Sequence, residues 1–322
     1  MEEKIVKHPL HGFSSKYDGK SLVTYLYSEK PQTFTHKEPE EQPEDELKEI
    51  WVRSFVKFFE APIDWYFNHV LGIKYEEDDD TLEETELFGL DYLQQWIIKN
   101  EFLDYEGDLN TFIDKGIKEG RLPLKNLGAV TAETLQEDVQ PIRDMFNQKR
   151  GSLPQKSIPI DLEGENWRIA GVVDNVFGST LIDYTFSDNI KYELRANLKT
   201  LLLSAQGAIS ASMLIDSGGE AIPLRVLEKE EALRKLDLLM GYLRKGMQSP
   251  LKFTLKATVK PKKGELTREK VTKAMRDEAY PNYRSPMPPN KYLQVLWEEG
   301  YFDDFDDNDL QELLNLSQLL NL

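Results

Sequence analysis

The 322-residue chain contains no cysteine and only four histidines, which removes several kinds of chemistry at the outset. Without thiols it forms no disulfide and offers no thiolate to a metal, and this usage fits a reducing compartment. No apolar run is long enough to cross a bilayer, and the N-terminus MEEKIVKHPLHGF lacks the apolar stretch of a secretory signal. We therefore expect a cytoplasmic protein without a membrane span.

Positive charge is also scarce, with 40 Lys and Arg against 57 Asp and Glu and a formal net charge of −17. A protein that gripped DNA over its whole surface would show the opposite balance. Any contact with DNA must therefore be local or made mainly by partner chains. The sequence also lacks a G-x-x-x-x-G-K-[ST] phosphate loop, so we expect no ATPase site of its own.

The hydrophobic pattern divides the chain into four parts. Residues 1–45, which end in a proline- and acid-rich stretch, predict an extended N-terminal segment. Residues 46–150 predict a helical region, and residues 277–322 a proline-rich link with an acidic, helical C-terminal tail. In the helical region, helices are expected over Leu47–Phe59, from Pro62, and over Leu90–Leu103, Phe112–Lys118 and Leu135–Phe146.

Residues 151–276 predict an α/β core, because the hydrophobic period changes after Gly151 from helical to alternating. Three strands over 157–164, 165–178 and 179–186 are expected to form an antiparallel meander. A helix over 190–206, strands over 209–217 and 221–227, and a helix over 229–244 follow. This order predicts a mixed sheet flanked by helices.

The segment GVVDNVFGSTLIDYTFS, residues 171–187, is the most informative for chemistry. Gly178-Ser179 suits a two-residue type II′ hairpin turn, which would pair Phe177 with Thr180. Counting back along both strands then places Asp174 opposite Asp183, with Cβ atoms roughly 4.5–5.5 Å apart. The period of two also puts Thr185 on the same face as Asp183.

Two facing carboxylates repel each other, so something must offset the repulsion. A divalent cation such as Mg²⁺ bound by Asp174 and Asp183 is one solution, because paired carboxylates supply hard oxygen ligands. A nearby lysine or arginine, or a raised pKa on one acid, is another. Alternatively, one aspartate is exposed to solvent or bonded to a backbone amide. The spacing alone leaves these alternatives open.

Basic residues gather between positions 252 and 276, where the only acids are Glu265 and Glu269. This stretch is the best candidate for backbone-type contacts with DNA phosphates. The candidate DNA-binding residues are Lys256, Lys260, Lys262, Lys263, Arg268 and Lys270. The alternative is a solvated charged helix and loop. Beyond it, Tyr280, Tyr283, Tyr292 and Trp297 predict a partner surface, with ordinary packing as the alternative.

The pattern G-V-V-D…L-I-D-Y-T resembles the core of the PD-(D/E)XK nuclease superfamily, whose fold is restriction-endonuclease-like, and in particular the RecB-type nuclease. The resemblance implies that Asp174 and Asp183 are the metal-binding acids and that Thr185 stands where the catalytic lysine belongs. Threonine supplies no cation, so the resemblance implies a degenerate site without a confident catalytic residue. Lys191, Arg195 and Lys199 on the next helix are the candidates for a displaced lysine.

Five more segments resemble, in the same order, the RecC family, which is a degenerate branch of that superfamily. They are HPLHGFS (8–14), FVKFFEAPIDWYFNHVLGI (55–73), ELFGLDYLQ (86–94), RLPLKNLG (121–128) and LDLLMGYLRKGMQSPLKF (236–253). The resemblance covers nearly all of this chain but only the C-terminal domain of a full-length subunit. A longer parent protein is therefore expected.

The RecC resemblance implies a place in exodeoxyribonuclease V, a bacterial ATP-dependent helicase–nuclease of DNA repair and recombination. RecB-like and RecD-like subunits would supply the motors and the nuclease. This domain would be a catalytically inactive scaffold that handles duplex ends and separated single strands, with no cofactor required. One alternative is an active metal-dependent exonuclease with a displaced lysine and Mg²⁺ at Asp174 and Asp183, and another is a pure protein-interaction module.

Overall fold

The computed structural model describes residues 48–75, 92–105, 107–122, 126–258, 265–282 and 288–321, all within the compact unit Asp45–Leu322. The predicted extended segment 1–45 lies outside the described residues, as does the stretch EEDDDTLEETE, residues 76–86. No helix in these ranges is long and apolar enough to cross a membrane.

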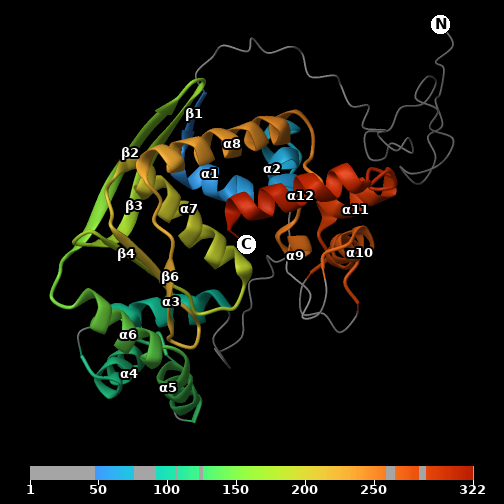
Figure 1. The fold of residues 1–322 in the computed structure, drawn as a ribbon. Helices are drawn as coiled ribbons and strands as arrows, with labels where there is room; N and C mark the ends of the chain where they lie inside the picture. The colour runs from blue at the N-terminus through green and yellow to red at the C-terminus, as the bar shows by residue number, and fades with distance from the viewer. Residues whose placement is uncertain are drawn as a thin grey trace, which may run out of the picture. The chain divides into compact units, whose positions relative to one another are not determined.

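A single mixed sheet of six strands forms the centre of the fold (Figure 1). The strands are β1 (Lys48–Trp51), β2 (Gln155–Gly164), β3 (Trp167–Phe177), β4 (Thr180–Tyr184), β5 (Ala211–Ile215) and β6 (Ala221–Leu224). β2 pairs antiparallel along β3, while β1 (parallel) and β4 (antiparallel) pair with the two ends of its other edge. β5 then runs parallel to β4, and β6 antiparallel to β5. The predicted meander and mixed sheet are confirmed.

The first strand corrects the helix predicted over Leu47–Phe59. Residues 48–51 pair in parallel with residues 167–170 of β3, and helix α1 (Val52–Glu60) begins only after them. Short apolar runs fit either a strand or a helix, and here the free edge of β3 supplies the backbone partners that decide between them. Trp51 stays 61% exposed at the end of this strand.

Helices pack on both sides of the sheet. They are α1, α2 (Pro62–Trp65) with the π-helical turn η1 (Tyr66–Val70), α3 (Tyr92–Asp104), α4 (Leu109–Lys118), α5 (Asn126–Asp138), α6 (Gln140–Arg150), α7 (Ile190–Gln206), α8 (Lys229–Gln248), α9 (Leu255–Thr258), α10 (Arg268–Ala279), α11 (Lys291–Glu298) and α12 (Asp307–Leu320). The single helix predicted over Leu135–Phe146 is wrong, because α5 ends at Asp138 and α6 begins at Gln140. Pro141 in the first turn of α6 explains the break, since proline cannot continue a helix interior but fits a helix start.

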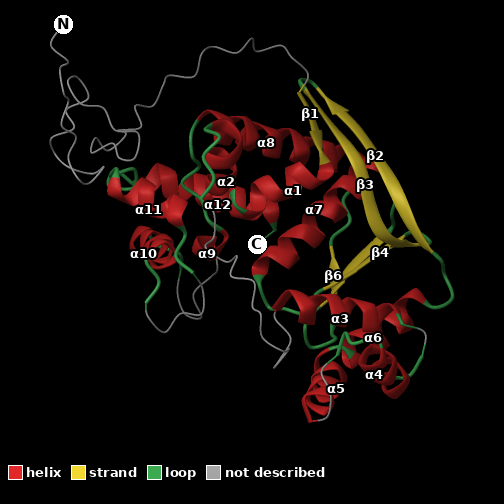
Figure 2. Cartoon of the chain, turned by 180° about the vertical axis from the view of Figure 1, so that it is seen from behind, coloured by secondary structure: helices red, strands yellow, loops and turns green. Residues whose placement is uncertain are grey.

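Neighbouring residues of β4 show that the sheet is buried on both faces. Leu181 belongs to a hydrophobic cluster with α1, α7 and α8, whereas Ile182 belongs to a second cluster with α3 to α6. Side chains alternate across a strand, so these two groups of helices cover opposite faces. Figures 1 and 2 show α1, α7 and α8 beside the long strands, and α3 to α6 grouped near β4 and β6. The predicted fold, a mixed sheet flanked by helices, is confirmed.

The larger cluster draws on three of the four predicted parts of the chain. Its members include Phe55, Phe58, Leu202, Leu236, Leu313 and Leu316. Asn197 of α7 also donates from Nδ2 to the carbonyl oxygens of Leu320 and Asn321, at 3.3 and 3.2 Å. The first helices of the 46–150 region and the 277–322 tail are therefore built into the α/β core.

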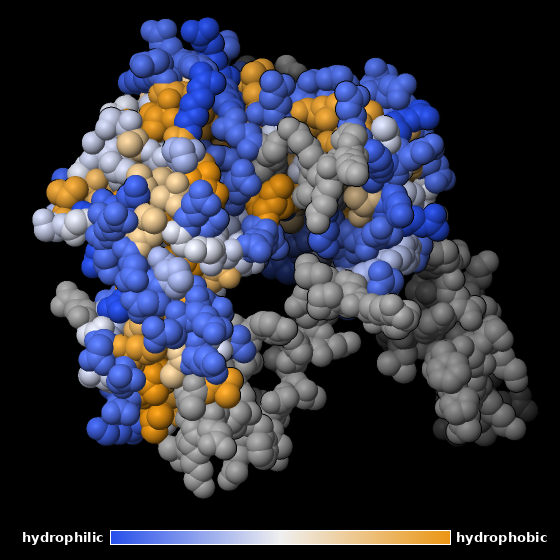
Figure 3. Space-filling view, turned by 60° about the horizontal axis from the view of Figure 1, so that its bottom comes forward, coloured by the Kyte–Doolittle hydropathy of each residue, from blue (hydrophilic) through white to orange (hydrophobic). Residues whose placement is uncertain are grey.

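Polar side chains dominate the face of the molecule that Figure 3 shows. On the face shown in Figure 3, hydrophilic residues cover most of the area, and hydrophobic groups gather in separate places. The exposed large apolar side chains include Trp51, Trp96, Val130, Val172 and Leu238, which belong to five different elements.

Candidate functional site

The hairpin that carries the two predicted acids contains a β-bulge. Phe177 pairs with Thr180, as predicted, and the ladder between β3 and β4 ends one pair later. On the other edge of β3, Lys156 pairs with Val176 but Ile158 pairs with Val173. Two residues of β3, 174 and 175, therefore stand opposite a single residue of β2.

The bulge turns Asn175, not Asp174, toward Asp183. Asn175 has a φ of 66°, a left-handed conformation that asparagine tolerates better than most residues. Its Nδ2 lies 3.4 Å from Asp183 Oδ1, and its Oδ1 accepts a hydrogen bond from Gln155 Nε2 at 2.8 Å. Asp174 is exposed. The prediction that Asp174 directly faces Asp183 is therefore wrong, because the extra residue breaks the period of two on which it rested.

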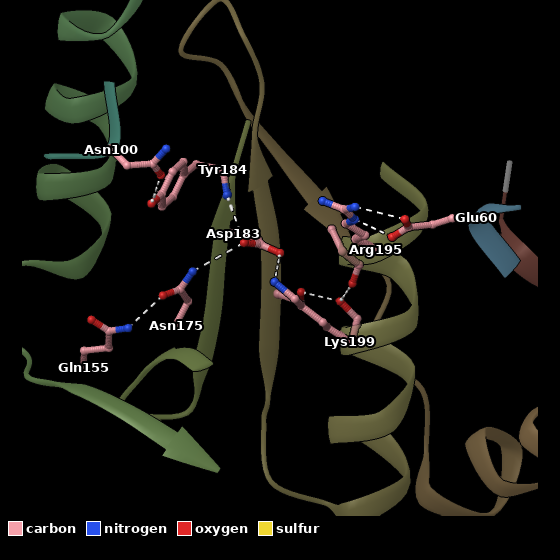
Figure 4. Close-up of polar contacts among 11 residues, drawn as sticks. Glu60, Asn100, Gln155, Asn175, Asp183, Tyr184, Arg195 and Lys199 are labelled. Carbon is pink, nitrogen blue, oxygen red and sulfur yellow. Dashed lines mark hydrogen bonds and ion pairs between the residues drawn. The ribbon is translucent and has the colours of Figure 1, made fainter. Parts of the chain in front are cut away.

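Asp183 is almost buried, with 8% of its surface exposed, and its charge is met by a lysine. Lys199 Nζ of α7 lies 2.6 Å from Asp183 Oδ2 (Figure 4). The other carboxylate oxygen accepts from the backbone N–H of Tyr184 at 3.3 Å as well as from Asn175. Of the alternatives that the sequence leaves open, a nearby lysine is the one that the geometry shows.

Thr185 closes a turn at the end of β4. Its backbone N–H donates to Ile215 O at 3.0 Å, which extends the pairing with β5. Its Oγ1 donates to the carbonyl of Ser187 at 2.9 Å and accepts from the N–H of the same residue at 3.0 Å. The side chain is buried, and its hydroxyl both donates and accepts a hydrogen bond within this turn.

Helix α7 presents three residues at helical spacing toward the site: Tyr192, Arg195 and Lys199. Arg195 binds Glu60, at the end of α1, through both Nε and Nη2, the latter at 2.9 Å (Figure 4). These hydrogen bonds raise the pKa of Arg195 above its ordinary value. Lys191 instead lies 5.0 Å from the centre of the Tyr192 ring. Of the three candidates for a displaced lysine, only Lys199 meets Asp183.

A pocket of about 300 Å³ opens between α3 and α7 at the end of β4. Its lining residues are Gln95, Trp96, Lys99, Asn100, Asn175, Asp183, Tyr184, Thr185, Phe186, Ser187, Tyr192, Arg195 and Lys199. The Tyr184 hydroxyl donates to Asn100 Oδ1 at 3.1 Å. Burial, together with the carboxylates of Asp104 and Asp183, raises the pKa of Tyr184 to about 12. The phenol is therefore neutral and serves as a hydrogen-bond donor at neutral pH.

The residues of this pocket do not fit a divalent cation shared by Asp174 and Asp183. Within the ranges that the structure describes, no three His, Cys, Asp or Glu residues lie close enough together to hold a metal ion. Among the described residues that line the pocket, Asp183 is the one acid, and Lys199 already binds it. Mg²⁺ prefers several oxygen ligands. The Lys199 ammonium group, 2.6 Å from Asp183 Oδ2, opposes the binding of a cation there, because the two positive charges repel.

Sequence reasoning missed Glu60, Asn175, Trp96 and Lys99. Glu60 ends a helix more than a hundred residues before its partner, and nothing local marks it. Asn175 directly follows the predicted acid, and only its tolerance for positive φ hints at the bulge. The spacing W-x-x-K in α3, residues 96–99, is the one signal that places Trp96 and Lys99 on a common helix face.

The candidate DNA-binding stretch is partly occupied by the acidic tail. Lys252 lies 2.7 Å from Asp304 and 2.9 Å from Asp309, and Arg268 lies 3.6 Å from Asp307. Lys270 donates to the carbonyl of Glu265 at 2.9 Å, and Lys256 is exposed. Lys260, Lys262 and Lys263 lie outside the described residues. DNA binding by this stretch stays a prediction.

Two of the aromatic residues assigned to a partner surface pack internally. The ring centres of Tyr292 and Phe67 are 5.3 Å apart, and those of Trp297 and Phe302 are 4.9 Å apart. Tyr280 is exposed, and Tyr283 lies outside the described residues. Ordinary packing, the alternative for these aromatic residues, thus accounts for Tyr292 and Trp297.

Comparison with known proteins identifies the family. Residues 47–260, which include the whole hairpin and α7, match the family model of the RecC C-terminal domain. The chain belongs to the RecC C-terminal domain family. The chain is 25% identical over 229 residues to the RecBCD enzyme subunit RecC of Haemophilus influenzae, covering 67% of this chain and 20% of that protein. It is 23% identical over 319 residues to RecC of Buchnera aphidicola, covering 95% of this chain and 29% of that protein.

RecC of Escherichia coli is 24% identical over 217 residues, covering 66% of this chain and 18% of that subunit. The chain therefore spans less than a third of the length of these RecC proteins. A solved structure from Eubacterium rectale, named as an exonuclease, aligns with a TM-score of 0.34 at 13% identity, covering 62% of this chain and 81% of that one. This last likeness is too small to carry an argument about function.

Two of the RecC-like segments meet in the core. Phe58, from the segment 55–73, packs against Gly246, from the segment 236–253, so closely that a Cβ on Gly246 would lie 2.5 Å from the Phe58 ring. These RecC-like motifs therefore hold α1 against α8, which positions the end of α1, and with it Glu60, beside α7.

Proposed function

We propose that this RecC-type domain is a non-catalytic, DNA-handling scaffold of a RecBCD-type helicase–nuclease that acts on double-strand DNA ends in recombinational repair. The observation that carries the proposal is the state of the hairpin site. Asp183 is bound by Lys199, and the bulge directs Asp174 away from it. A metal-dependent nuclease needs an open metal site beside the phosphate, and this arrangement supplies none.

The partners follow from the family. We propose that RecB-like and RecD-like subunits supply the ATP-driven motors and the nuclease, and that the assembly is bacterial and cytoplasmic. The RecC relatives are named as subunits of the RecBCD enzyme, which supports a place in such a complex. The sequence itself lacks a nucleotide-binding phosphate loop, which supports dependence on partner motors.

A second candidate is an active PD-(D/E)XK exonuclease with a displaced lysine. The observation that favours it is the position of Lys199, which brings an ammonium group to 2.6 Å from Asp183 out of the following helix. For cleavage, the hairpin would have to rearrange so that Asp174 joins Asp183 around a cation. The remaining alternative, a pure protein-interaction module, differs because it predicts no salt-dependent binding of DNA.

A cleavage assay tests the proposal directly. The purified chain is incubated with end-labelled linear duplex and single-stranded DNA in Mg²⁺ or Mn²⁺, beside the variants Asp174→Ala and Asp183→Ala. We expect no cleavage by any of them. Cleavage by the wild type that both variants lose would overturn the scaffold proposal and establish the nuclease. Cleavage that persists equally in both variants would indicate a contaminating nuclease, which a repeat purification removes.

Assembly with partners is the second test. The chain is co-expressed with RecB-like and RecD-like subunits, and the complex is isolated by size-exclusion chromatography. Co-elution with salt-sensitive DNA binding by the complex supports the scaffold. If the chain co-elutes but the complex binds DNA equally well with and without it, the result would favour the interaction module.

A further inference from the structure

We infer that the pocket between α3 and α7 binds one nucleotide unit of single-stranded DNA, with its base against Trp96 and its phosphate near the surrounding cations. The inference deepens the DNA-handling proposal and rests on it for the source of the ligand. It needs neither a metal nor Asp174, so it uses the pocket as the structure shows it.

The chemistry of the lining favours an anion. Of the lining residues that the structure describes, three are cationic, Lys99, Arg195 and Lys199, and one, Asp183, is a carboxylate. The other two carboxylates that hold these cations do not line it. Lys99 binds Asp138 at 2.7 Å, and Arg195 binds Glu60. Each of the three cations is paired with one carboxylate, so the site is close to neutral, but each cation keeps further N–H donors that can bind a phosphate oxygen.

Aromatic side chains supply the second half of a nucleotide site. Trp96 on α3 lines the pocket and is 51% exposed. Its large apolar ring surface is therefore in contact with water and available to a stacked base. Tyr192 lines it from α7, with its ring beside Lys191 and Arg195, at 5.0 and 5.3 Å from the ring centre. Bases stack on such rings without regard to sequence, while nearby cations hold the backbone.

The two helices present these groups in the same way. On α3, Trp96 and Lys99 are three residues apart, and on α7, Tyr192 and Arg195 are three residues apart, so each helix places a ring and a neighbouring cation on its pocket face. A volume of about 300 Å³ lies at the lower end of the range of small-ligand sites. The pocket can therefore hold one nucleotide, but it is too small for a DNA duplex. An extended single strand is the form of DNA that can offer one unstacked base.

Binding to a fluorescein-labelled single-stranded oligothymidylate tests the inference. The full chain is titrated in EDTA, which prevents any metal-dependent cleavage, and binding is followed by fluorescence anisotropy at low and moderate salt. Trp96→Ala removes the exposed ring, and we expect the affinity to fall about tenfold. Trp51→Ala is the matched control, because Trp51 is also an exposed tryptophan but lies on β1, outside the pocket. We expect this variant to bind the oligonucleotide with the wild-type affinity. Circular dichroism and urea unfolding establish that both variants are folded.

Competitors identify the ligand. Unlabelled oligothymidylate displaces the probe if the inference is right, duplex DNA competes weakly, and dTMP at high concentration competes if a free nucleotide suffices. Lys99→Ala is expected to reduce the salt dependence of binding as well as the affinity. Equal effects of Trp96→Ala and Trp51→Ala, or displacement of the probe by oligoglutamate as readily as by oligothymidylate, would overturn the inference.

The outcome is separable from that of the proposed function. A chain that cleaves DNA in Mg²⁺ and loses binding with Trp96→Ala overturns the non-catalytic proposal but keeps the nucleotide site. A chain that does not cleave and binds DNA equally well with Trp96→Ala keeps the scaffold proposal and overturns the nucleotide site.

Discussion

Lys199 of α7 and Asp183 of β4 form an ion pair of 2.6 Å across the hairpin site. The two side chains come from consecutive elements, and each is mostly shielded from water, with 28% and 12% of the side chain exposed. An acid and a base that another protein would direct at a substrate here neutralise each other. The pair therefore explains both why the acid tolerates burial and why a cation is not needed to hold it.

The first prediction concerns the stability that this pair provides. Lys199→Ala leaves the Asp183 carboxylate nearly buried without its cation, and we expect a loss of about 1–3 kcal/mol in the free energy of unfolding. Adding Asp183→Asn removes the uncompensated charge and is expected to restore part of the loss. Urea unfolding of both single variants and the double variant measures the coupling. Lys191→Ala on the same helix is the control, and additive effects in the cycle would contradict the prediction.

The second prediction uses the bulge to rebuild an acid pair. Asn175→Asp places a second carboxylate where the amide now lies 3.4 Å from Asp183. Repulsion between the two carboxylates raises the pKa of the pair and destabilises the variant by about 1 kcal/mol at neutral pH. This stability is regained as the pH falls below the raised pKa, because one carboxylate then becomes protonated. We also expect Mn²⁺ to raise the melting temperature of this variant but not that of the wild type.

Asp174→Asn is the control for this experiment, because Asp174 is exposed on the other side of the bulge. It is expected to change neither the pH dependence nor the response to Mn²⁺. A strong response to Mn²⁺ in the wild type that Asp174→Asn abolishes would show that both original acids hold a metal.

The third prediction compares two glycines of α8. A Cβ on Gly246 would lie 2.5 Å from Phe58 Cζ and 3.2 Å from Leu251 Cγ, whereas nothing lies within 4 Å of a Cβ on Gly241. Gly246→Ala is therefore expected to destabilise the fold by about 1–3 kcal/mol through overpacking. Gly241→Ala is expected to stabilise it by about 0.5–1 kcal/mol, because alanine favours the helix. Thermal or urea unfolding measures both, and effects of the same sign would refute the packing assignment.

The fourth prediction concerns Glu278 of α10, a partly buried carboxylate close to residues of α2 and α9. Burial raises the pKa of Glu278, the nearby Asp64 carboxylate adds to the rise, and Lys256 and a hydrogen bond from Thr254 oppose it. Glu278 Oε2 makes no hydrogen bond with any described residue. Because the pKa of Glu278 is raised in the folded state, its contribution to the free energy of unfolding is fully present below the ordinary value of 4.5. This contribution is lost as the pH rises through the raised pKa.

Glu278→Gln removes this titration. We expect the variant to lose less stability than the wild type between acidic and neutral pH, as measured by urea midpoints across that range. Asp277→Asn, an exposed neighbour on the same helix, is expected to keep the wild-type dependence. If Glu278→Gln follows the wild-type curve, the fall in stability must come from other carboxylates such as Asp64, whose pKa burial also raises.

The sequence by itself determined the central elements and the family. The strands β2 to β6 and the helices α7 and α8 follow from hydrophobic period and turn chemistry, which are local properties, and Gly178-Ser179 fixed the pairing of Phe177 with Thr180. The resemblance to the nuclease superfamily also named Lys199, with Lys191 and Arg195, as a candidate for a displaced lysine.

Only the tertiary structure decided which groups meet. The sequence carries no mark of the backbone partners that turn residues 48–51 into a strand, because β3 lies more than a hundred residues away. It carries no clear mark of the bulge either, and one extra residue was enough to exchange Asp174 for Asn175 beside Asp183. Strand alternation is a local rule that holds only while the ladder is regular, whereas bulges, ion pairs and pockets depend on how distant elements pack.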